Sequence, residues 1–369
     1  MMAEKTLSIC IPTFNRTNAL NSTLGMLGDD ILGLENEVEI CVSDNCSSDN
    51  TQDVLSRWEN RLPLVHSRNE RNMGVDINII RSAKLASGSF IWFMGDDDRI
   101  IPGTIRKLIS DIKSCVEKDV NAIYIIHTIR SKKVFRFGFD DFRLFKKEDI
   151  TFELNLCFIG TVCVRRDTVQ RLIMEKTREG DGKVYKKGFD YPIFHEFMHT
   201  YLFLECAMEG GYIGVEPTYG MDFVAIEART TNKKKIFLEL LMVRYYLEIR
   251  RYYPWTKKPN MPIILYWKRL LSVGAIVTEQ PNLDFAYQKL LKTYLRILTS
   301  ENRWPELILT RLFEMTRKNP VSKFLLIRAH DYIRKLQGLE LNKEDDSGPY
   351  LEKQMQYVIS NIDDLLQKK

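Results

Sequence analysis

Three consecutive carboxylates, those of Asp96, Asp97 and Asp98, are the residues with the clearest chemical potential in this sequence. They follow an apolar run at 90–94 that has the composition of a buried strand. Adjacent carboxylates repel one another, and leaving them unpaired at a strand end is unfavourable unless water, cations or a metal compensate them. Oxygen ligands suit Mg²⁺ or Mn²⁺, which proteins commonly hold with one or two carboxylates and the phosphates of a substrate. The run therefore predicts a metal site; the alternative is an acidic turn in which Asp98 caps a helix opened by Pro102.

Polar residues also follow the other predicted strands of the N-terminal region. They are Pro12, Thr13, Asn15 and Arg16 after the first strand, Asp44 and Asn45 after the second, and Arg71, Asn72 and Gly74 after the third. Because open α/β sheets bind ligands at the carboxyl ends of their strands, we expect these residues to line one site. Asp44 could accept a hydrogen bond from a nucleotide base, whereas Asp49 or Asn50 is explained as a helix cap. Arg16, Arg68 and Arg71 are candidate contacts to a diphosphate or a base; the alternative is that they are solvated.

An alternation of short β-rich runs and helical patterns positions these residues. We predict strands at 7–11, 38–43, 64–66, 90–94 and 122–127, and helices at 18–27, 51–58, 76–86 and 102–118. Between 131 and 217 the pattern is mixed, with β-like pieces at 134–139, 161–164 and 212–215 and helices at 167–176 and 193–208. From residue 236 onward only helical periodicity remains. The predicted fold class is α/β, a mixed, mainly parallel sheet flanked by helices, followed by an all-helical C-terminal region.

Four motifs occur in the order and spacing of a known family. They are LSICIPTFNR at 7–16, VSDNCSSDNT at 42–51, NMG at 72–74, and ASGSFIWFMGDDD at 86–98 with Pro102. The sequence resembles glycosyltransferase family 2 over about residues 5–220, and most closely its abequosyltransferase-like branch. The resemblance implies a Rossmann-like GT-A fold and an inverting transfer from a nucleoside-diphosphate sugar.

The same resemblance implies roles for individual residues. Thr13, Asn15 and Asp44 fall where the family holds the nucleoside, and residues 96–98 fall on its metal-binding DxD motif. Alignment on Pro102 makes Asp97 the leading metal ligand, although Gly95 stands where many members carry the first Asp.

The catalytic base is a separate question, because an inverting transfer needs a group that takes the proton of the acceptor hydroxyl. Family members often place an Asp about a dozen residues before a glycine and a short strand. Counting back from Gly210 in this sequence leads to His199, which can act as a base at neutral pH. The alternative is that His199 is a core residue, and Asp190 and Glu196 are the other candidates for the base.

Composition restricts the compartment and the partners. The seven cysteines occur as singletons without a CxxC pair, so neither a zinc site nor a disulfide framework is indicated, which favours a reducing cytoplasm. No apolar run approaches the roughly 18 residues of a membrane span. A net charge of +5 is too modest for a general nucleic-acid binder. We expect a cytoplasmic protein, with peripheral attachment to the inner face of the cell membrane as an open alternative.

That alternative depends on the stretch 229–258, where nine Lys or Arg face two Glu and alternate with Tyr and Trp. Such a stretch suits an anionic membrane surface, but it equally suits a helix packed on a neighbouring domain. We predict a GT-A catalytic domain at 1–225 and a helical domain at 226–369 that contacts a membrane or a partner. Within the catalytic domain, 1–110 would bind the nucleotide sugar and 111–225 would face the acceptor.

The predicted activity is a metal-dependent hexosyltransferase reaction that serves polysaccharide or glycoconjugate synthesis. Its predicted ligands are Mn²⁺ or Mg²⁺, a nucleotide-sugar donor, and a glycan or polyprenyl-linked acceptor. One alternative is a sugar nucleotidyltransferase, although residues 12–16 lack the glycine-rich loop that such an enzyme normally carries after its first strand. The other is a non-catalytic carbohydrate-binding or scaffold protein, since the family's usual base is absent from its expected position.

Overall fold

The computed structural model describes residues 5–115, 117–129, 132–133, 139–150, 156, 158–180, 183–187 and 197–223, and single positions beyond them. The chain divides into two compact units, residues 1–225 with 255–257, and residues 226–254 with 258–369. In the second unit every described position lies in a helix, as predicted; these positions are 240, 244, 285–286, 289–290, 293, 355–360 and 362.

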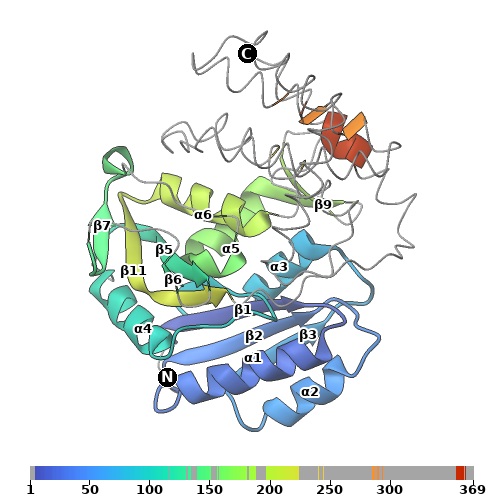
Figure 1. Ribbon diagram of the computed structural model, residues 1–369, viewed down its shortest axis with the longest axis horizontal. Helices are drawn as coiled ribbons and strands as arrows, with labels where there is room; N and C mark the ends of the chain where they lie inside the picture. Colours follow the sequence, from blue (N-terminus) through green and yellow to red (C-terminus); the bar gives the residue numbers. More distant parts are fainter. Residues whose placement is uncertain are drawn as a thin grey trace, which may run out of the picture. The chain divides into compact units, whose positions relative to one another are not determined.

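A mixed sheet forms the centre of the first unit (Figure 1). Within the described residues it has nine strands, in the order β3-β2-β1-β4-β8-β5-β11-β7, with β6 paired to β5. The strands are β1 (Leu7–Thr13), β2 (Val38–Asp44), β3 (Leu64–Arg68), β4 (Phe90–Phe93), β5 (Val120–Ile129), β6 (Lys132–Lys133), β7 (Arg143–Phe145), β8 (Val162–Arg165) and β11 (Tyr212–Phe223). Strands β1 to β4 are parallel, and β8 enters antiparallel between β4 and β5. The predicted GT-A, Rossmann-like mixed sheet is therefore confirmed.

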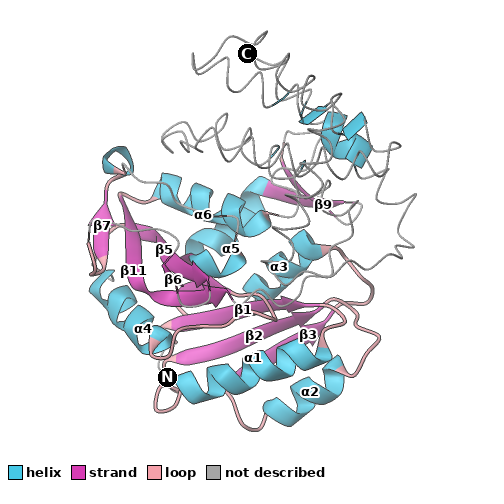
Figure 2. Ribbon diagram, in the orientation of Figure 1, coloured by secondary structure: helices cyan, strands magenta, loops and turns pink. Residues whose placement is uncertain are grey.

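Helices cover both faces of this sheet (Figure 2). They are α1 (Thr17–Asp30), α2 (Thr51–Trp58), α3 (Val75–Lys84), α4 (Thr104–Cys115), α5 (Arg166–Lys176) and α6 (Met198–Glu209). Helices α1 and α2 lie on one face of the parallel strands, and α3 lies on the other, beside α5 and α6. Short elements complete the unit: the hairpin β9 (Thr177–Gly180) and β10 (Lys183–Lys186), and two 3₁₀ turns at Lys147–Asp149 and Ile159–Thr161.

The central parallel strands are buried on both faces, which explains their nearly continuous apolar sequences. Every residue of β2 is buried, and in β1 only Pro12 is partly exposed. Helix α1 adds Leu20, Leu24 and Leu27, which are fully buried against this core. Each such side chain contributes about 1.5–3 kcal/mol on burial, so the core fixes the strand ends that carry the polar loops.

Several boundaries differ from the prediction. Strand β1 continues through Pro12 to Thr13, because a proline removes one N–H but keeps an extended backbone that still pairs with β2. Strand β11 runs well past residue 215, with a register irregularity between Glu216 and Gly220. The β9–β10 hairpin was not predicted. The helix predicted at 193–208 is described only from Met198, and most of the strand predicted at 134–139 lies outside the described residues.

The basic and aromatic stretch at 229–258 lies almost entirely outside the described residues. Its one described basic side chain, Arg244, is helical and only 1% exposed. No helix in the described part of the chain is long and apolar enough to cross a membrane.

Candidate functional site

Four loops meet at one edge of the sheet, because the carboxyl ends of β1 to β4 lie side by side. Thr13 at the end of β1 is the register partner of Asp44 at the end of β2, and Asp44 is in turn the partner of Arg68 at the end of β3. Strand β4 lies on the other side of β1 and leads directly into the acidic run. Strand register thus places the loops that carry the predicted polar residues at one edge of the sheet.

The acidic run is held by β1 and its following loop. The Thr13 hydroxyl donates to Asp96 Oδ2 at 2.7 Å, and Arg16 Nη1 donates to Asp96 Oδ1 at 3.2 Å. The same Arg16 nitrogen contacts Asp97 Oδ2. From helix α1, the Thr23 hydroxyl donates to the backbone carbonyl of Asp96 at 2.9 Å. Asp96 is 6% exposed, so it anchors the loop, whereas the Asp97 side chain is 36% exposed.

Asp98 closes its own turn instead of capping the next helix. Its Oδ2 accepts a hydrogen bond from the backbone N–H of Gly95 at 2.7 Å. Helix α4 receives its N-terminal acceptor from Asp30 at the end of α1, which accepts from the N–H groups of Gly103 and Ile105. The alternative in which Asp98 caps that helix is therefore wrong.

The turn also accounts for the glycine where the family pattern has an aspartate. A Cβ added at Gly95 would lie 3.0 Å from Asp98 Oδ2 and 3.2 Å from Asp98 Cγ. A side chain at this position would push against the carboxylate that closes the turn. Gly95 is therefore part of the local geometry of this loop.

Burial makes the negative charge of the run expensive. Desolvation raises the pKa of Asp96 to about 6, although the Thr13 hydrogen bond and the Arg16 charge oppose the rise. Desolvation likewise raises the pKa of Asp98 to about 7, against the hydrogen bond from Gly95 and with the charges of Asp97 and Asp96 adding to it. Partial burial lowers the pKa of Arg16, but the charges of Asp96 and Asp97 outweigh this and raise it. The Arg16 guanidinium thus does not offset the cost of burying Asp96 and Asp98.

Asp96 and Asp97 share Arg16 as a partner, whereas Asp98 accepts from the backbone N–H of Gly95. In the described part of the chain, no group of three or more His, Cys, Asp or Glu side chains is arranged to hold a metal ion. One exposed carboxylate is nevertheless the donor that Mg²⁺ or Mn²⁺ uses when substrate phosphates supply further oxygens. Asp97 fits this mode of binding, and Asp96 and Asp98 supply nearby charge.

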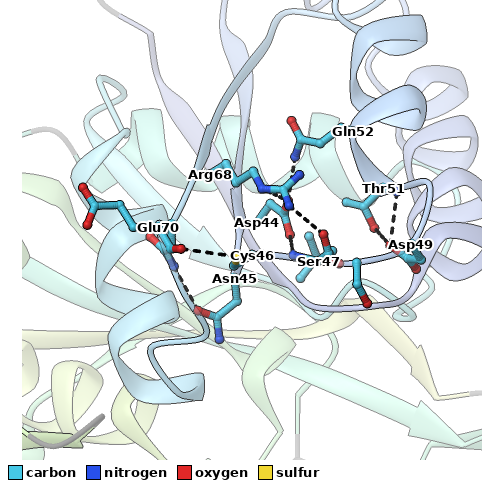
Figure 3. Close-up of polar contacts among 12 residues, drawn as sticks. Asp44, Asn45, Cys46, Ser47, Asp49, Thr51, Gln52, Arg68 and Glu70 are labelled. Carbon is cyan, nitrogen blue, oxygen red and sulfur yellow. Dashed lines mark hydrogen bonds and ion pairs between the residues drawn. The ribbon is translucent and has the colours of Figure 1, made fainter.

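Asp44 is satisfied by the protein itself. Its side chain is fully buried, with Oδ1 accepting from the Ser47 N–H at 2.9 Å and Oδ2 accepting from Gln52 Nε2 at 2.6 Å. Arg68 Nε lies 3.8 Å from Oδ2, and Arg68 Nη2 donates to the Ser47 carbonyl at 2.8 Å. Figure 3 shows the Gln52 amide and the Arg68 guanidinium both facing this carboxylate. In this structure Asp44 closes its loop, and its predicted contact to a base stays a prediction.

Asparagine side chains join the loops to one another. Asn45 Oδ1 accepts from Asn69 Nδ2 at 3.0 Å and from the Met73 N–H at 2.8 Å, and Asn45 Nδ2 donates to Asn72 Oδ1 at 2.8 Å. Asn78, at 2% exposure, donates to the Thr13 carbonyl at 3.2 Å and accepts from Ser43 and Asn69. This asparagine network ties the ends of β1, β2 and β3 to the start of α3.

The remaining predicted binding residues occupy different settings. Asn15 has a φ of 52° and accepts from the Ser48 N–H at 2.8 Å, so it bridges the first two loops. Gly74 has a φ of 82°, a conformation that glycine adopts without strain, where the chain turns into α3. Pro12 lies within β1, and Arg71 is exposed on the loop after β3.

His199 is the only candidate base that the structure describes. It lies in the first turn of α6 at 4% exposure, with Nε2 3.1 Å from the Leu156 carbonyl oxygen, which also accepts from Thr200 at 2.6 Å. This environment is typical of a packed core histidine. Asp190 and Glu196 lie outside the described residues. The assignment of the base therefore stays a prediction.

Sequence reasoning missed Gln52, Thr23 and Asn78 as parts of this site. Asn78 left a signal, since it is a polar residue between Ile77 and Ile79 in a helix that directly follows a strand-end loop. Gln52 and Thr23 left none, because each contact depends on how its helix packs.

Comparison with known proteins adds the family. The sequence model of glycosyl transferase family 2 matches residues 8–167, which contain all four loops of the site. Residues 8–167 belong to glycosyl transferase family 2. The resemblance inferred from the four motifs is thereby confirmed for this part of the chain.

Individual members of the family are similar over shorter segments. The abequosyltransferase RfbV of Salmonella typhimurium is 36% identical over 104 residues, which are 28% of this chain and 31% of that protein. The validoxylamine A glucosyltransferase of Streptomyces hygroscopicus is 38% identical over 90 residues, 24% of this chain and 21% of that protein. A GalNAc(5)-diNAcBac-PP-undecaprenol β-1,3-glucosyltransferase of Campylobacter jejuni is 31% identical over 105 residues, which are 28% of this chain and 33% of that protein. The match thus spans a third or less of each relative.

Solved structures of glycosyltransferases are also similar to the chain. Residues 1–349 of Staphylococcus aureus TarS, in complex with UDP-GlcNAc, give a TM-score of 0.48 at 16% identity, covering 98% of this chain and 90% of that one. The mannosyltransferase PcManGT of Pyrobaculum calidifontis, in complex with GDP-Man and Mn²⁺, gives a TM-score of 0.48 at 16% identity. The alignment covers 92% of this chain and 90% of that one.

Proposed function

We propose that this chain is an inverting, metal-dependent glycosyltransferase that moves a sugar from a nucleoside-diphosphate sugar to a glycan or lipid-linked acceptor. The observation that carries the proposal is the convergence of Thr13, Arg16, Asp96 and Asp97 at one sheet edge, next to the Asp44 loop. This edge lies within the segment that belongs to the family. A site with one exposed carboxylate, one guanidinium and a preformed polar loop suits a ligand that brings its own phosphates.

The residues divide the work of binding the donor. Asp97 would hold Mn²⁺ or Mg²⁺, which supplies positive charge to the departing diphosphate when bound. Arg16 offers a guanidinium whose geometry matches phosphate oxygens. Thr13 and Thr23 hold Asp96 and keep the acidic loop against β1 and α1. The Asp44 loop would receive the nucleoside. A nucleotide base that contacts Asp44 would displace the Gln52 amide from this carboxylate.

The acceptor side needs a base that takes the proton of the attacking hydroxyl. We place this role on Asp190 or Glu196 in preference to His199. The burial of His199 and its contact with the Leu156 carbonyl support a packing role for that side chain. Exchange of His199 for Gln would retain most of the transfer activity, and exchange of the true base would not.

The names of the relatives support the acceptor class. One is an abequosyltransferase, and another acts on a glycan carried by a polyprenyl diphosphate, as its name states. We therefore propose a glycan or polyprenyl-linked acceptor for this chain as well. An acceptor of that kind would bring the protein to a membrane surface, which agrees with the basic stretch at 229–258.

Donor hydrolysis tests the proposal. The full chain would be incubated with UDP-, GDP-, dTDP- and CDP-sugars, with Mn²⁺ or with EDTA, and the release of nucleoside diphosphate measured. We expect slow release from one donor class that needs Mn²⁺ and is lost in Asp97→Asn. Asp29→Asn, at an exposed aspartate of α1, is the matched control and should behave as wild type.

Two other results would contradict the proposal in different ways. Neither binding nor release with any donor would favour the non-catalytic carbohydrate-binding or scaffold protein. Exchange of labelled pyrophosphate into a nucleoside triphosphate would instead favour the sugar nucleotidyltransferase.

A further inference from the structure

We propose that Arg16 and the divalent metal compete for Asp97, so that Arg16 weakens metal binding in the free protein and moves to the donor's diphosphate when donor and metal bind together. The inference rests on the proposed function, because it needs both a metal at Asp97 and a diphosphate beside it. It makes Arg16 a donor-binding residue that couples the two binding events.

The contacts of Arg16 carry the first step. A single nitrogen, Nη1, contacts both Asp96 Oδ1, at 3.2 Å, and Asp97 Oδ2. Asp96 has a second donor in the Thr13 hydroxyl, at 2.7 Å. Arg16 can therefore leave the pair without stripping Asp96 of every hydrogen bond. Within the described residues, Arg16 is the cation that forms an ion pair with Asp97.

Exposure carries the second step. The Arg16 side chain is 51% exposed and that of Asp97 is 36% exposed, so their contact lies at the surface of the loop. Surface ion pairs are weak, because water screens them and holding long side chains costs conformational entropy. A divalent ion on Asp97 would also repel a guanidinium held at hydrogen-bond distance from the same carboxylate. A divalent ion that binds Asp97 would therefore displace Arg16 at little energetic cost.

The position of Arg16 carries the third step. It is the last residue before helix α1, in the loop after β1, and that strand pairs with β2 so that Thr13 lies opposite Asp44. A donor that spans the Asp44 loop and Asp97 would therefore bring its diphosphate past Arg16. A guanidinium binds phosphate oxygens through two parallel hydrogen bonds and stays charged at any physiological pH. The released side chain would exchange one anionic partner for another.

Competition predicts two effects of opposite sign for Arg16→Ala. The affinity for Mn²⁺ alone should rise about threefold, as expected for removing an exposed competing charge. The affinity for nucleoside diphosphate at saturating Mn²⁺ should fall about tenfold, because a charge-assisted contact to phosphate is lost. A residue that only stabilised the acidic loop would lower both affinities.

The experiment measures the two affinities separately on the full chain. Mn²⁺ binding without nucleotide is followed by the loss of the free-ion electron paramagnetic resonance signal. Binding of UDP, GDP and dTDP is then measured by calorimetry at saturating Mn²⁺. Arg99→Ala removes the same charge two residues beyond Asp97 and is the matched control, since Arg99 is exposed. Arg16→Lys keeps the charge but loses the planar fork, so it should bind Mn²⁺ as wild type does and still bind nucleotide more weakly.

Unchanged or lower Mn²⁺ affinity in Arg16→Ala would overturn the inference, as would an equal rise in Arg99→Ala, which would reduce the effect to general electrostatics. If wild type binds nucleoside diphosphates and Arg16→Ala binds them equally well, this inference fails alone. If wild type binds none of them with Mn²⁺, the proposed function fails and the inference falls with it. Circular dichroism of each variant checks that the fold is retained.

Discussion

At the carboxyl edge of the sheet, Asp44 and Asp97 carry the same chemical group in two opposite settings. Asp44 is fully buried and accepts hydrogen bonds from the Ser47 N–H and the Gln52 amide, with Arg68 beside it. Asp97 is 36% exposed, and its recorded ion pair is with Arg16, which it shares with Asp96. Fixed donors occupy both oxygens of the buried carboxylate without any ligand, whereas the more exposed carboxylate remains accessible to a cation.

The difference separates holding a loop from holding a ligand. The Asp44 loop is complete before any ligand arrives, since its hydrogen bonds and the asparagine network fix it. The acidic loop is anchored through Asp96 and Asp98 but leaves Asp97 available. We therefore expect substitutions of Asp97 to affect binding and catalysis, and substitutions around Asp44 to affect stability as well.

The largest effect is expected for Asp97→Ala. Loss of the proposed metal contact should lower kcat/KM for the donor by about 10²–10³-fold, the range seen when a group that stabilises developing charge is removed. The free energy of unfolding in urea should change by less than about 0.5 kcal/mol, as for an ordinary surface substitution. A large loss of stability with the same loss of activity would remove the contrast with Asp44.

Asp44→Ala should have the opposite profile in stability. The Ser47 N–H, the Gln52 amide and the Arg68 guanidinium would lose a buried acceptor, which should cost about 3 kcal/mol of unfolding free energy. Urea denaturation measures this cost, and Asp53→Ala, at an exposed site on α2, is the matched control. Equal stability of the two variants would mean that Asp44 does not hold its loop.

The asparagine network sharpens the comparison, because it contains buried and exposed members. Asn78→Ala should lower the free energy of unfolding by about 2 kcal/mol, since the Thr13 carbonyl, Ser43 and Asn69 would lose a buried partner. Asn72→Ala removes an exposed partner of Asn45 and should cost less, about 1 kcal/mol, because Asn45 Nδ2 keeps its contact with the Gly74 carbonyl. Equal costs would show that burial does not set the worth of these contacts.

A buried acid away from the site extends the comparison to pH. Burial raises the pKa of Asp111 to about 7, with Lys107 opposing the rise and Glu216 adding to it. The folded protein therefore binds this proton more tightly than the unfolded chain, so the unfolding free energy falls as pH rises from about 4 to about 7. In Asp111→Asn this contribution is absent. The difference in unfolding free energy between the variant and wild type should therefore shift by about 1 kcal/mol in favour of the variant between pH 5 and pH 8. Thermal melts across this range measure it; parallel curves for the two proteins would contradict it.

The sequence allowed the sheet and the position of the site to be predicted, because both depend on local signals. Apolar runs marked β1 to β4, and the polar residues after them were placed together by the geometry of parallel strands. The GT-A, mainly parallel sheet was predicted for the same reason.

The partners of the site residues could not be predicted in the same way. Gln52 reaches Asp44 from the first turn of α2, and Asp30 caps α4 from the end of α1. Both contacts depend on how helices pack over the sheet, which a local pattern does not encode. The turn closed by Asp98 could not be predicted either. The carboxylate of Asp98 meets the backbone N–H of Gly95 only when the chain folds back on itself.

The most direct test of the central claim is calorimetric titration of wild type and Asp97→Ala with the nucleotide sugar that gives hydrolysis, each with Mn²⁺ and with EDTA. We predict binding by wild type that requires Mn²⁺, and at least a tenfold loss of affinity in Asp97→Ala with an unchanged circular dichroism spectrum, as expected for losing the one exposed carboxylate of the site. Equal affinity in EDTA, or an Asp97→Ala protein that binds as wild type does, would contradict the account.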